Sequence, residues 1–121
     1  MQAQPIAAVM IHVSSVPEAL NWYQQLFPNA QRQRLAADNF EYLSLDGISL
    51  EFVHADEKVS SGPAGSVVYW LVPKLNLALA HAQIVGAKLY RGPLHIENGY
   101  AICQLQNPWG NCIGLRGLAS D

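Results

Sequence analysis

Glu51 is the residue of this sequence best placed to do chemistry. It stands between Leu50 and Phe52 in an alternating segment, so its carboxylate is predicted on the less apolar face of a strand. A half-buried carboxylate there can act as a general base, or it can accept a hydrogen bond from a ligand. The alternative is a structural role, in which Glu51 pairs with a cross-strand partner such as Arg116.

His12 and Tyr69 could join Glu51 in such a site. His12 is predicted on the mixed face of the first strand, as a proton shuttle or ligand-binding group, or else as a histidine satisfied within the sheet. Tyr69 could stack on a ligand or hydrogen-bond to it, or it could fill the core. The predicted ligand-binding residues are Met10, His12, Glu51, Tyr69, Leu71 and Arg116, and Glu51 is also the candidate catalytic residue.

Two further features could belong to a binding site. Phe40 and Tyr42 can line a cavity, but the pattern leaves open which side of their strand they face. The segment Arg91–Pro93 is predicted as a loop before the last hairpin. It could be a mobile cationic lid that selects an anionic ligand, but a solvated surface loop is the favoured interpretation.

The order strand, helix, three strands is predicted twice. Ser15 caps the first helix with Glu18 as its capping-box partner, and Asp46-Gly47 forms a two-residue hairpin turn. The first set comprises a strand over Ile6–Val13, a helix ended by Pro28, and strands over Gln31–Leu35, Phe40–Leu45 and Ile48–Val53. The second comprises Val67–Val72, a helix over Leu75–Val85, Lys88–Tyr90, Tyr100–Gln106 and Asn111–Arg116.

These two sets can be superimposed as an internal repeat. Leu20 falls on Leu79 and, with a slightly longer offset, Gly47 falls on Gly110. The predicted fold class is α+β, with a single domain of two tandem βαβββ modules at about 6–54 and 66–117, joined by a Ser/Gly/Pro-containing linker at 55–65. The alternative is an ordinary α+β sandwich with accidental similarity.

Three motifs resemble those of one superfamily. They are the strand-to-helix segment Val13–Tyr23, the strand Leu50-Glu51-Phe52, and the turn Asn107-Pro108-Trp109-Gly110-Asn111 that opens the last strand. Over residues 6–117 the chain is similar to the vicinal oxygen chelate superfamily of glyoxalase, bleomycin-resistance and dioxygenase proteins. The resemblance implies paired modules whose sheets curl around a ligand pocket. It also implies a choice between metal-dependent catalysis and metal-free antibiotic binding.

The same resemblance assigns four metal-ligand positions to this chain. They fall on Ala8, Glu51, Val67 and Gly114, and of these only Glu51 has a donor atom. One carboxylate does not hold a catalytic cation, which needs about three protein ligands. His12 lies ~13 Å along the strand from Ala8, too far to replace it. A metal site of His12 and Glu51 would have to recruit a further ligand such as His54 or His95.

Composition limits the partners of the chain. Charged residues are 13% of the sequence and the net charge is −2, which argues against nucleic-acid binding. The sequence shows neither a secretion signal nor an apolar stretch of membrane-spanning length, so a cytoplasmic protein without membrane association is predicted. Cys103 and Cys112 are expected as reduced thiols that could face each other across a hairpin. A homodimer is predicted, with module pairing within the chain or across the dimer left open.

The sequence therefore predicts a protein that captures a small organic molecule without a metal or other cofactor. The alternative is an enzyme of glyoxalase or dioxygenase type, with Glu51 as base or as one ligand of a non-standard metal site. A purely structural module is the least favoured hypothesis, because the mixed faces carry converging polar groups. The ligand itself cannot be named from the sequence.

Overall fold

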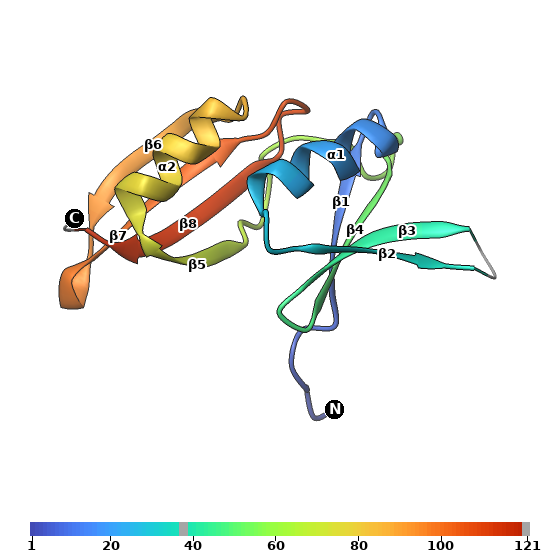
Figure 1. The fold of residues 1–121 in the computed structure, drawn as a ribbon, viewed down its shortest axis with the longest axis horizontal. Coiled ribbons are helices and arrows are strands. Elements are labelled where there is room, and N and C mark those ends of the chain that lie inside the picture. Colours follow the sequence, from blue (N-terminus) through green and yellow to red (C-terminus); the bar gives the residue numbers. More distant parts are fainter. Residues whose placement is uncertain (37–38, 120–121) are drawn as a thin grey trace. The chain divides into compact units, whose positions relative to one another are not determined.

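The computed structural model describes residues 1–36 and 39–119, which fold as two compact units, Met1–Ser60 and Ser61–Asp121. The boundary between these units, called unit 1 and unit 2, falls inside the predicted linker 55–65. Each unit has one helix and a four-stranded sheet (Figure 1).

Unit 1 has strand order β1-β4-β3-β2. β1 and β4 run parallel, whereas β3 is antiparallel to both of its neighbours. The helix supplies the crossover that a parallel pair requires. The elements are β1 (Ala8–Val13), α1 (Val16–Leu26), β2 (Gln31–Leu35), β3 (Phe40–Leu45) and β4 (Ile48–His54).

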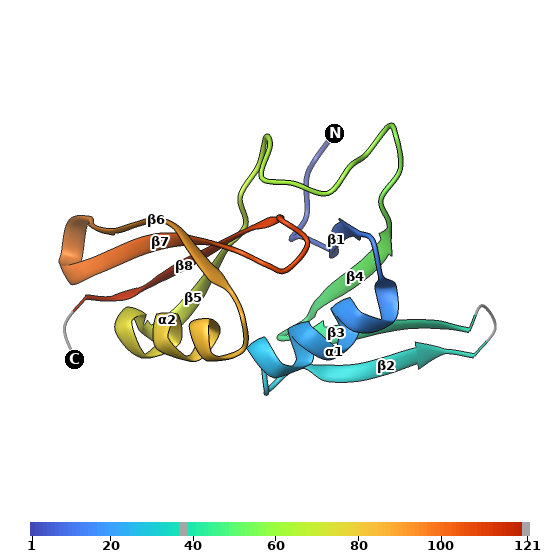
Figure 2. The same cartoon turned by 90° about the horizontal axis from the view of Figure 1, so that it is seen from above.

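Unit 2 repeats this topology with order β5-β8-β7-β6, and α2 lies along one face of its sheet (Figure 2). β5 and β8 are parallel and the other pairs are antiparallel. The predicted α+β class with two βαβββ modules is therefore confirmed. The elements are β5 (Tyr69–Lys74), α2 (Leu75–Ile84), β6 (Lys88–His95), a short 3₁₀ turn (Glu97–Gly99), β7 (Tyr100–Gln106) and β8 (Cys112–Leu118).

β6 departs from the prediction. The segment Arg91–Pro93, predicted as a loop, lies within this strand, which continues to His95. The register against β7 shifts on both sides of Arg91, and Gly92 has a φ of 88°. β6 is an edge strand, and edges and bulges are where a sheet accommodates proline and glycine. The lid interpretation is therefore wrong, because these residues are held by pairing with β7.

The start of α1 is also only partly as predicted. Ser15 is the N-cap residue with extended backbone angles, and the amide of Ala19 donates to its carbonyl oxygen at 3.0 Å. Its side chain makes no capping hydrogen bond, so the capping box predicted with Glu18 is not formed. Pro17 in the first turn, where no intrahelical amide is needed, supports the helix start instead.

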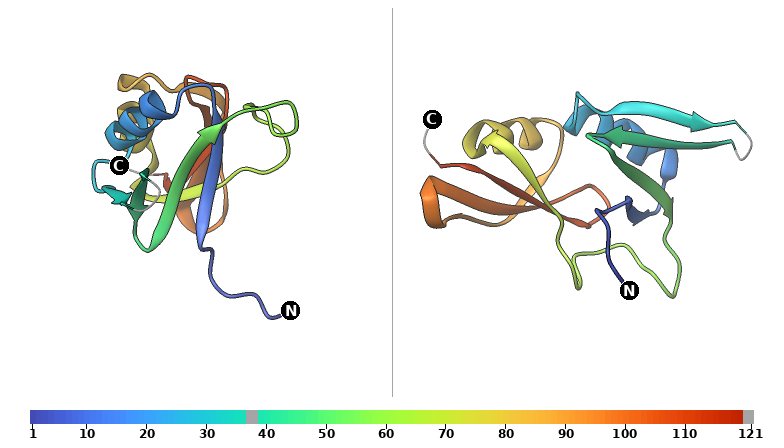
Figure 3. Two further views of the ribbon diagram at one scale, coloured as in Figure 1. Left: turned by 90° about the vertical axis from the view of Figure 1, so that its right-hand side faces the viewer. Right: turned by 90° about the horizontal axis from the view of Figure 1, so that it is seen from below.

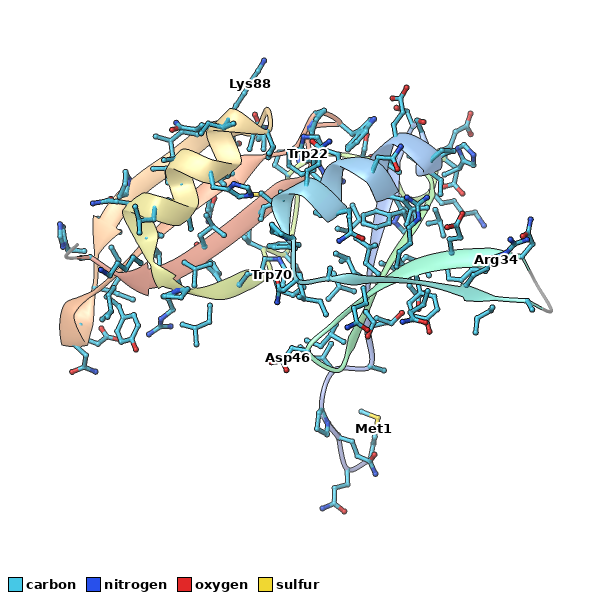
Figure 4. All side chains as sticks on the ribbon, viewed as in Figure 1. Met1, Trp22, Arg34, Asp46, Trp70 and Lys88 are labelled. Atoms are coloured by element: carbon cyan, nitrogen blue, oxygen red, sulfur yellow. The ribbon has the colours of Figure 1, made fainter. Side chains whose placement is uncertain are left out.

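The core of unit 1 lies between α1 and the sheet. Tyr23 of α1 and Phe52 of β4 are each only 1% exposed, and their ring centres are 4.8 Å apart. Trp22, labelled in Figure 4, is buried and packs edge-on against Tyr23. Trp70 on β5 is only half-buried.

Unit 2 buries a smaller set of side chains beneath α2. Only Leu75 and Ala82 of this helix are buried, and they pack on the sheet. The sheet contributes every second residue of β7 and β8, as strand alternation requires. These residues are Ala101, Cys103, Leu105, Ile113 and Leu115.

The β7–β8 turn is organised by one buried polar side chain, Asn107, which is 4% exposed. Its Oδ1 accepts hydrogen bonds from the backbone amides of Trp109 and Asn111, both at 2.9 Å. Its Nδ2 donates to Oδ1 of Asn111 at 3.0 Å. Gly110, with a φ of 87°, completes the turn.

Asn107→Ala is expected to lower the free energy of unfolding by about 2 kcal/mol, because it leaves two backbone amides of the turn without their acceptor. Asn107→Asp is the matched control, since it keeps the acceptor oxygen and should lose less than half as much. Urea denaturation followed by circular dichroism measures both. Equal losses in the two variants would contradict the role given to Oδ1.

Candidate functional site

The face of the unit 1 sheet that turns away from α1 is called open face 1. The register places Met10 opposite Glu51, and His12 opposite Val53, as neighbours on this face. Three of the predicted ligand-binding residues therefore come together. Met10 remains 51% exposed, which is high for an apolar side chain beside a carboxylate. The residues of open face 1 are Ala8, Met10, His12, Gln31, Gln33, Leu35, Phe40, Tyr42, Ser44, Ser49, Glu51 and Val53.

The β3–β4 turn settles which side Phe40 and Tyr42 face. Asp46 and Gly47 both have positive φ, 49° and 84°, as a type I′ turn requires. This turn pairs Ser44 with Ser49 on open face 1. By strand alternation Phe40 and Tyr42 lie on the same face. Their rings stack with centres 6.3 Å apart and an interplanar angle of 19°.

Glu51 is half-buried and is oriented by a residue that the sequence did not single out. The hydroxyl of Ser49 donates to Oε2 of Glu51 at 2.8 Å. Within the described residues, Oε1 accepts no hydrogen bond. Arg116, the predicted alternative partner of Glu51, belongs to unit 2. Its guanidinium carbon lies 5.8 Å from the centre of the Tyr100 ring.

The face of the unit 2 sheet away from α2 is called open face 2. Leu71 pairs with Arg116, and Tyr69 pairs with Gly114, so the remaining three predicted ligand-binding residues are neighbours. Leu71 is 76% exposed. A hollow of about 360 Å³ lies between Leu71, Val72, Pro73, Tyr100 and Leu118. Further residues of this face include Ile102, Gln104, Gln106 and Cys112.

The Tyr69 ring occupies the space above Gly114. A Cβ atom added at Gly114 would lie 2.5 Å from Cδ1 of this ring. Nε2 of Gln104 donates to the Tyr69 hydroxyl at 2.9 Å and holds the ring in place. The position that the superfamily resemblance assigns to an acidic metal ligand is therefore a glycine covered by an aromatic side chain.

The other assigned metal positions provide no donor set either. Val67 lies before β5 begins, and Ala8 is a neighbour of Ser49 in the register. Across residues 1–36 and 39–119, no group of three or more His, Cys, Asp or Glu side chains is placed to hold a metal ion. Among these residues, the positions that the resemblance assigns to metal ligands therefore do not make up a metal-binding donor set.

Comparison with known proteins adds information at the level of structure. No protein-family model matches the sequence, and no curated protein matches it. Among solved structures, a glyoxalase/bleomycin resistance protein/dioxygenase family enzyme from Burkholderia phytofirmans is 18% identical with a TM-score of 0.73, over 93% of this chain and 97% of that one. TnmS3, an antibiotic-binding protein from Streptomyces, is 19% identical with a TM-score of 0.72, over 98% of this chain and 99% of that one. An integron cassette protein from Vibrio cholerae is 16% identical with a TM-score of 0.73, over 97% of both chains.

This chain has the glyoxalase/bleomycin-resistance fold. The expectation drawn from the three motifs is confirmed at that level. In addition, none of the helices in the described chain is long and apolar enough to cross a lipid bilayer.

Within this glyoxalase/bleomycin-resistance fold, neither cysteine is an activated nucleophile. Cys103 is buried on the helix side of its sheet and pairs with Leu115, whereas Cys112 lies on open face 2 and pairs with Gln106. The expectation that they face each other is wrong. Cys112 pairs with Gln106 of β7, and Gln106 and Cys103 lie on opposite faces of that strand because side chains alternate along it. Burial raises the pKa of both thiols, although a backbone hydrogen bond at Ile113 acts in the opposite direction on Cys112.

Proposed function

We propose that this protein captures a small, partly aromatic molecule on its open faces without the help of a metal ion. The observation that carries the proposal is the composition of open face 1, where a half-buried carboxylate stands among a stacked aromatic pair and an exposed methionine. Such a mixture of apolar walls and few polar groups is typical of small-molecule sites. The structural likeness to an antibiotic-binding protein also supports capture as the function.

The metal-free part of the proposal rests on Tyr69. The Tyr69 ring lies over Gly114, and its hydroxyl is bonded to Gln104. An aromatic surface therefore occupies one of the four positions that the resemblance assigns to metal ligands. A ligand that meets this face would contact the ring edge and the Leu71 side chain rather than a cation. On open face 1, Glu51 serves as an acceptor for a donor or cationic group of a ligand bound to that face.

Tryptamine, an aromatic amine, is a suitable probe because its ring can pack on the aromatic pair while its ammonium group reaches Glu51. Isothermal titration calorimetry should give the same affinity before and after treatment with EDTA. Glu51→Gln should weaken binding about tenfold, because a charge-assisted hydrogen bond is lost. Glu57→Gln, at an exposed glutamate of unit 1, is the matched control and should change nothing.

Loss of tryptamine binding on removal of metal would overturn the metal-free proposal. Equal affinities for the Glu51→Gln and wild-type proteins would remove Glu51 from the binding site.

An enzymatic role of Glu51 is the second candidate function, and the Ser49 contact favours it. One carboxylate oxygen is fixed by the hydroxyl while Oε1 is left available, an arrangement that suits a general base. A panel of α-carbonyl substrates would distinguish the two functions. In an enzyme, Glu51→Gln would retain affinity and lose turnover, whereas in a capture protein the wild type would show no turnover.

A further inference from the structure

Unit 1 has a second hollow, on the side of its sheet that carries α1. It has a volume of about 460 Å³ and lies between the first half of α1 and the outer part of β2, β3 and β4. Its apolar lining includes Val16, Pro17, Leu20 and Phe52, and its polar lining includes Arg32, Glu41 and His54. This α1 hollow opens on the α1 side of the sheet, and of the residues of open face 1 only Phe40 and Val53 also line it.

Arg32 is the best-fixed polar group of the α1 hollow. Its Nε donates to Oε2 of Glu41 at 2.8 Å, and its Nη1 donates to Oδ1 of Asn21 at 2.8 Å. Within residues 1–36 and 39–119, Nη2 has no acceptor. The guanidinium is therefore held from two sides with donors to spare. A group held in this way loses little conformational freedom when it binds an anion.

The internal repeat shows that the fold does not require this ion pair. Leu43 and Leu105 are equivalent, since each pairs with an inward residue of the last strand of its unit. Arg32 pairs with Leu43, and its counterpart in unit 2 is Leu89, which pairs with Leu105. Glu41 likewise corresponds to Cys103. Unit 2 thus uses uncharged residues where unit 1 has a salt bridge at the rim of a hollow.

We infer that the α1 hollow binds a small amphipathic monocarboxylate, with its apolar body against Leu20 and Phe52 and its carboxylate on Arg32. The planar guanidinium matches a carboxylate better than it matches a single-point acceptor. Glu41 sets the limit on charge, because a dianion such as a phosphate ester would be repelled by this neighbouring carboxylate. The exposed imidazole of His54 on the rim provides a further donor.

The test is a titration of the full chain with phenylacetate, followed by two-dimensional ¹H–¹⁵N NMR. Saturable shifts are expected in residues 16–20 and 52–54, with a Kd of about 1 mM, the affinity expected for one apolar ring and one ionic contact. Phenylacetamide, which has the same shape without the charge, should bind at least tenfold more weakly. Equal binding of the two probes would overturn the inference.

Three variants distinguish a carboxylate site from a merely structural ion pair. Arg32→Leu introduces the residue found at the equivalent position of unit 2 and should weaken phenylacetate binding at least tenfold. Arg32→Lys should cause most of this loss of affinity, because a lysine cannot make the paired hydrogen bonds of a guanidinium. Glu41→Gln should strengthen binding about threefold by removing the competing carboxylate. The matched control is Arg34→Leu, labelled in Figure 4: it lies on the same face of β2 and bonds to Asn39, but it is not among the residues that line the hollow.

Equal effects of the Arg32 and Arg34 substitutions, or weaker binding by Glu41→Gln, would contradict the carboxylate site. Glu51→Gln should leave phenylacetate binding unchanged, so failure of the capture function on open face 1 would not be mistaken for failure here. The spectra themselves report whether each variant is folded.

Discussion

Phe52→Ala is expected to lower the free energy of unfolding by about 4 kcal/mol. The side chain is 1% exposed, and its ring lies 4.8 Å from that of Tyr23. Truncation removes the transfer free energy of the ring and leaves a cavity between α1 and β4, which the helix cannot close without losing its other contacts. Urea denaturation monitored by fluorescence measures the loss.

Phe40→Ala is the matched control for this prediction. Phe40 lies on open face 1, is half-buried, and stacks on Tyr42. Its truncation should lower the free energy of unfolding by about 1 kcal/mol, because only part of the Phe40 ring is buried in the folded protein. If Phe40 lines the ligand site, however, the variant should lose tryptamine affinity. Similar stability losses in both variants would contradict the assignment of core and open face.

The order of elements was predictable from sequence because hydrophobic alternation and turn residues are local signals. The limits of β2, β3 and β7 are as predicted. β2 and β3 lie side by side in the right-hand view of Figure 3. β6 was not, since Gly92 and Pro93 indicate a loop locally and only pairing with β7 makes them part of a strand. β5 begins at Tyr69, two residues later than predicted, because pairing with β8 defines its start.

The candidate site was predictable where the alternation of side chains along a strand determines which residues share a face. Met10 and Glu51 were placed on one face correctly, since a parallel pair keeps equivalent residues side by side. The side of Phe40 and Tyr42 was left open, although the Asp46-Gly47 turn carried the answer through the register that it imposes. The contacts of Tyr69 with Gly114 and Gln104 could not be predicted, because they depend on a side-chain rotamer across three strands.

The two units differ where the first strand leads into the helix. In unit 1, β1 ends at Val13 and α1 begins at Val16, so two serines join them. In unit 2, β5 ends at Lys74 and α2 begins at once with Leu75. The tighter connection is accompanied by a register shift in β5. It brings the backbone of this junction against the last strand of the sheet.

Gly117 is where that close approach occurs, and Gly117→Ala is expected to destabilise the protein by about 3 kcal/mol. The added Cβ would lie 2.6 Å from the carbonyl oxygen of Val72 and 3.1 Å from the amide nitrogen of Leu75. Both are backbone atoms at the junction of β5 and α2, so neither can move without disturbing the strand or the helix. The midpoint of urea denaturation should fall accordingly.

Gly114→Ala, on the same strand but the opposite face, is the matched control. It distinguishes a clash with backbone atoms from a clash with a side chain that can move. Its Cβ would also meet an atom at 2.5 Å, but that atom belongs to the Tyr69 ring, which can rotate away. The expected loss is about 1 kcal/mol, and the Gln104 contact to the Tyr69 hydroxyl should be lost with it. A larger loss for Gly114→Ala than for Gly117→Ala would mean that the Tyr69 ring, rather than the β5–α2 junction, limits the packing of unit 2.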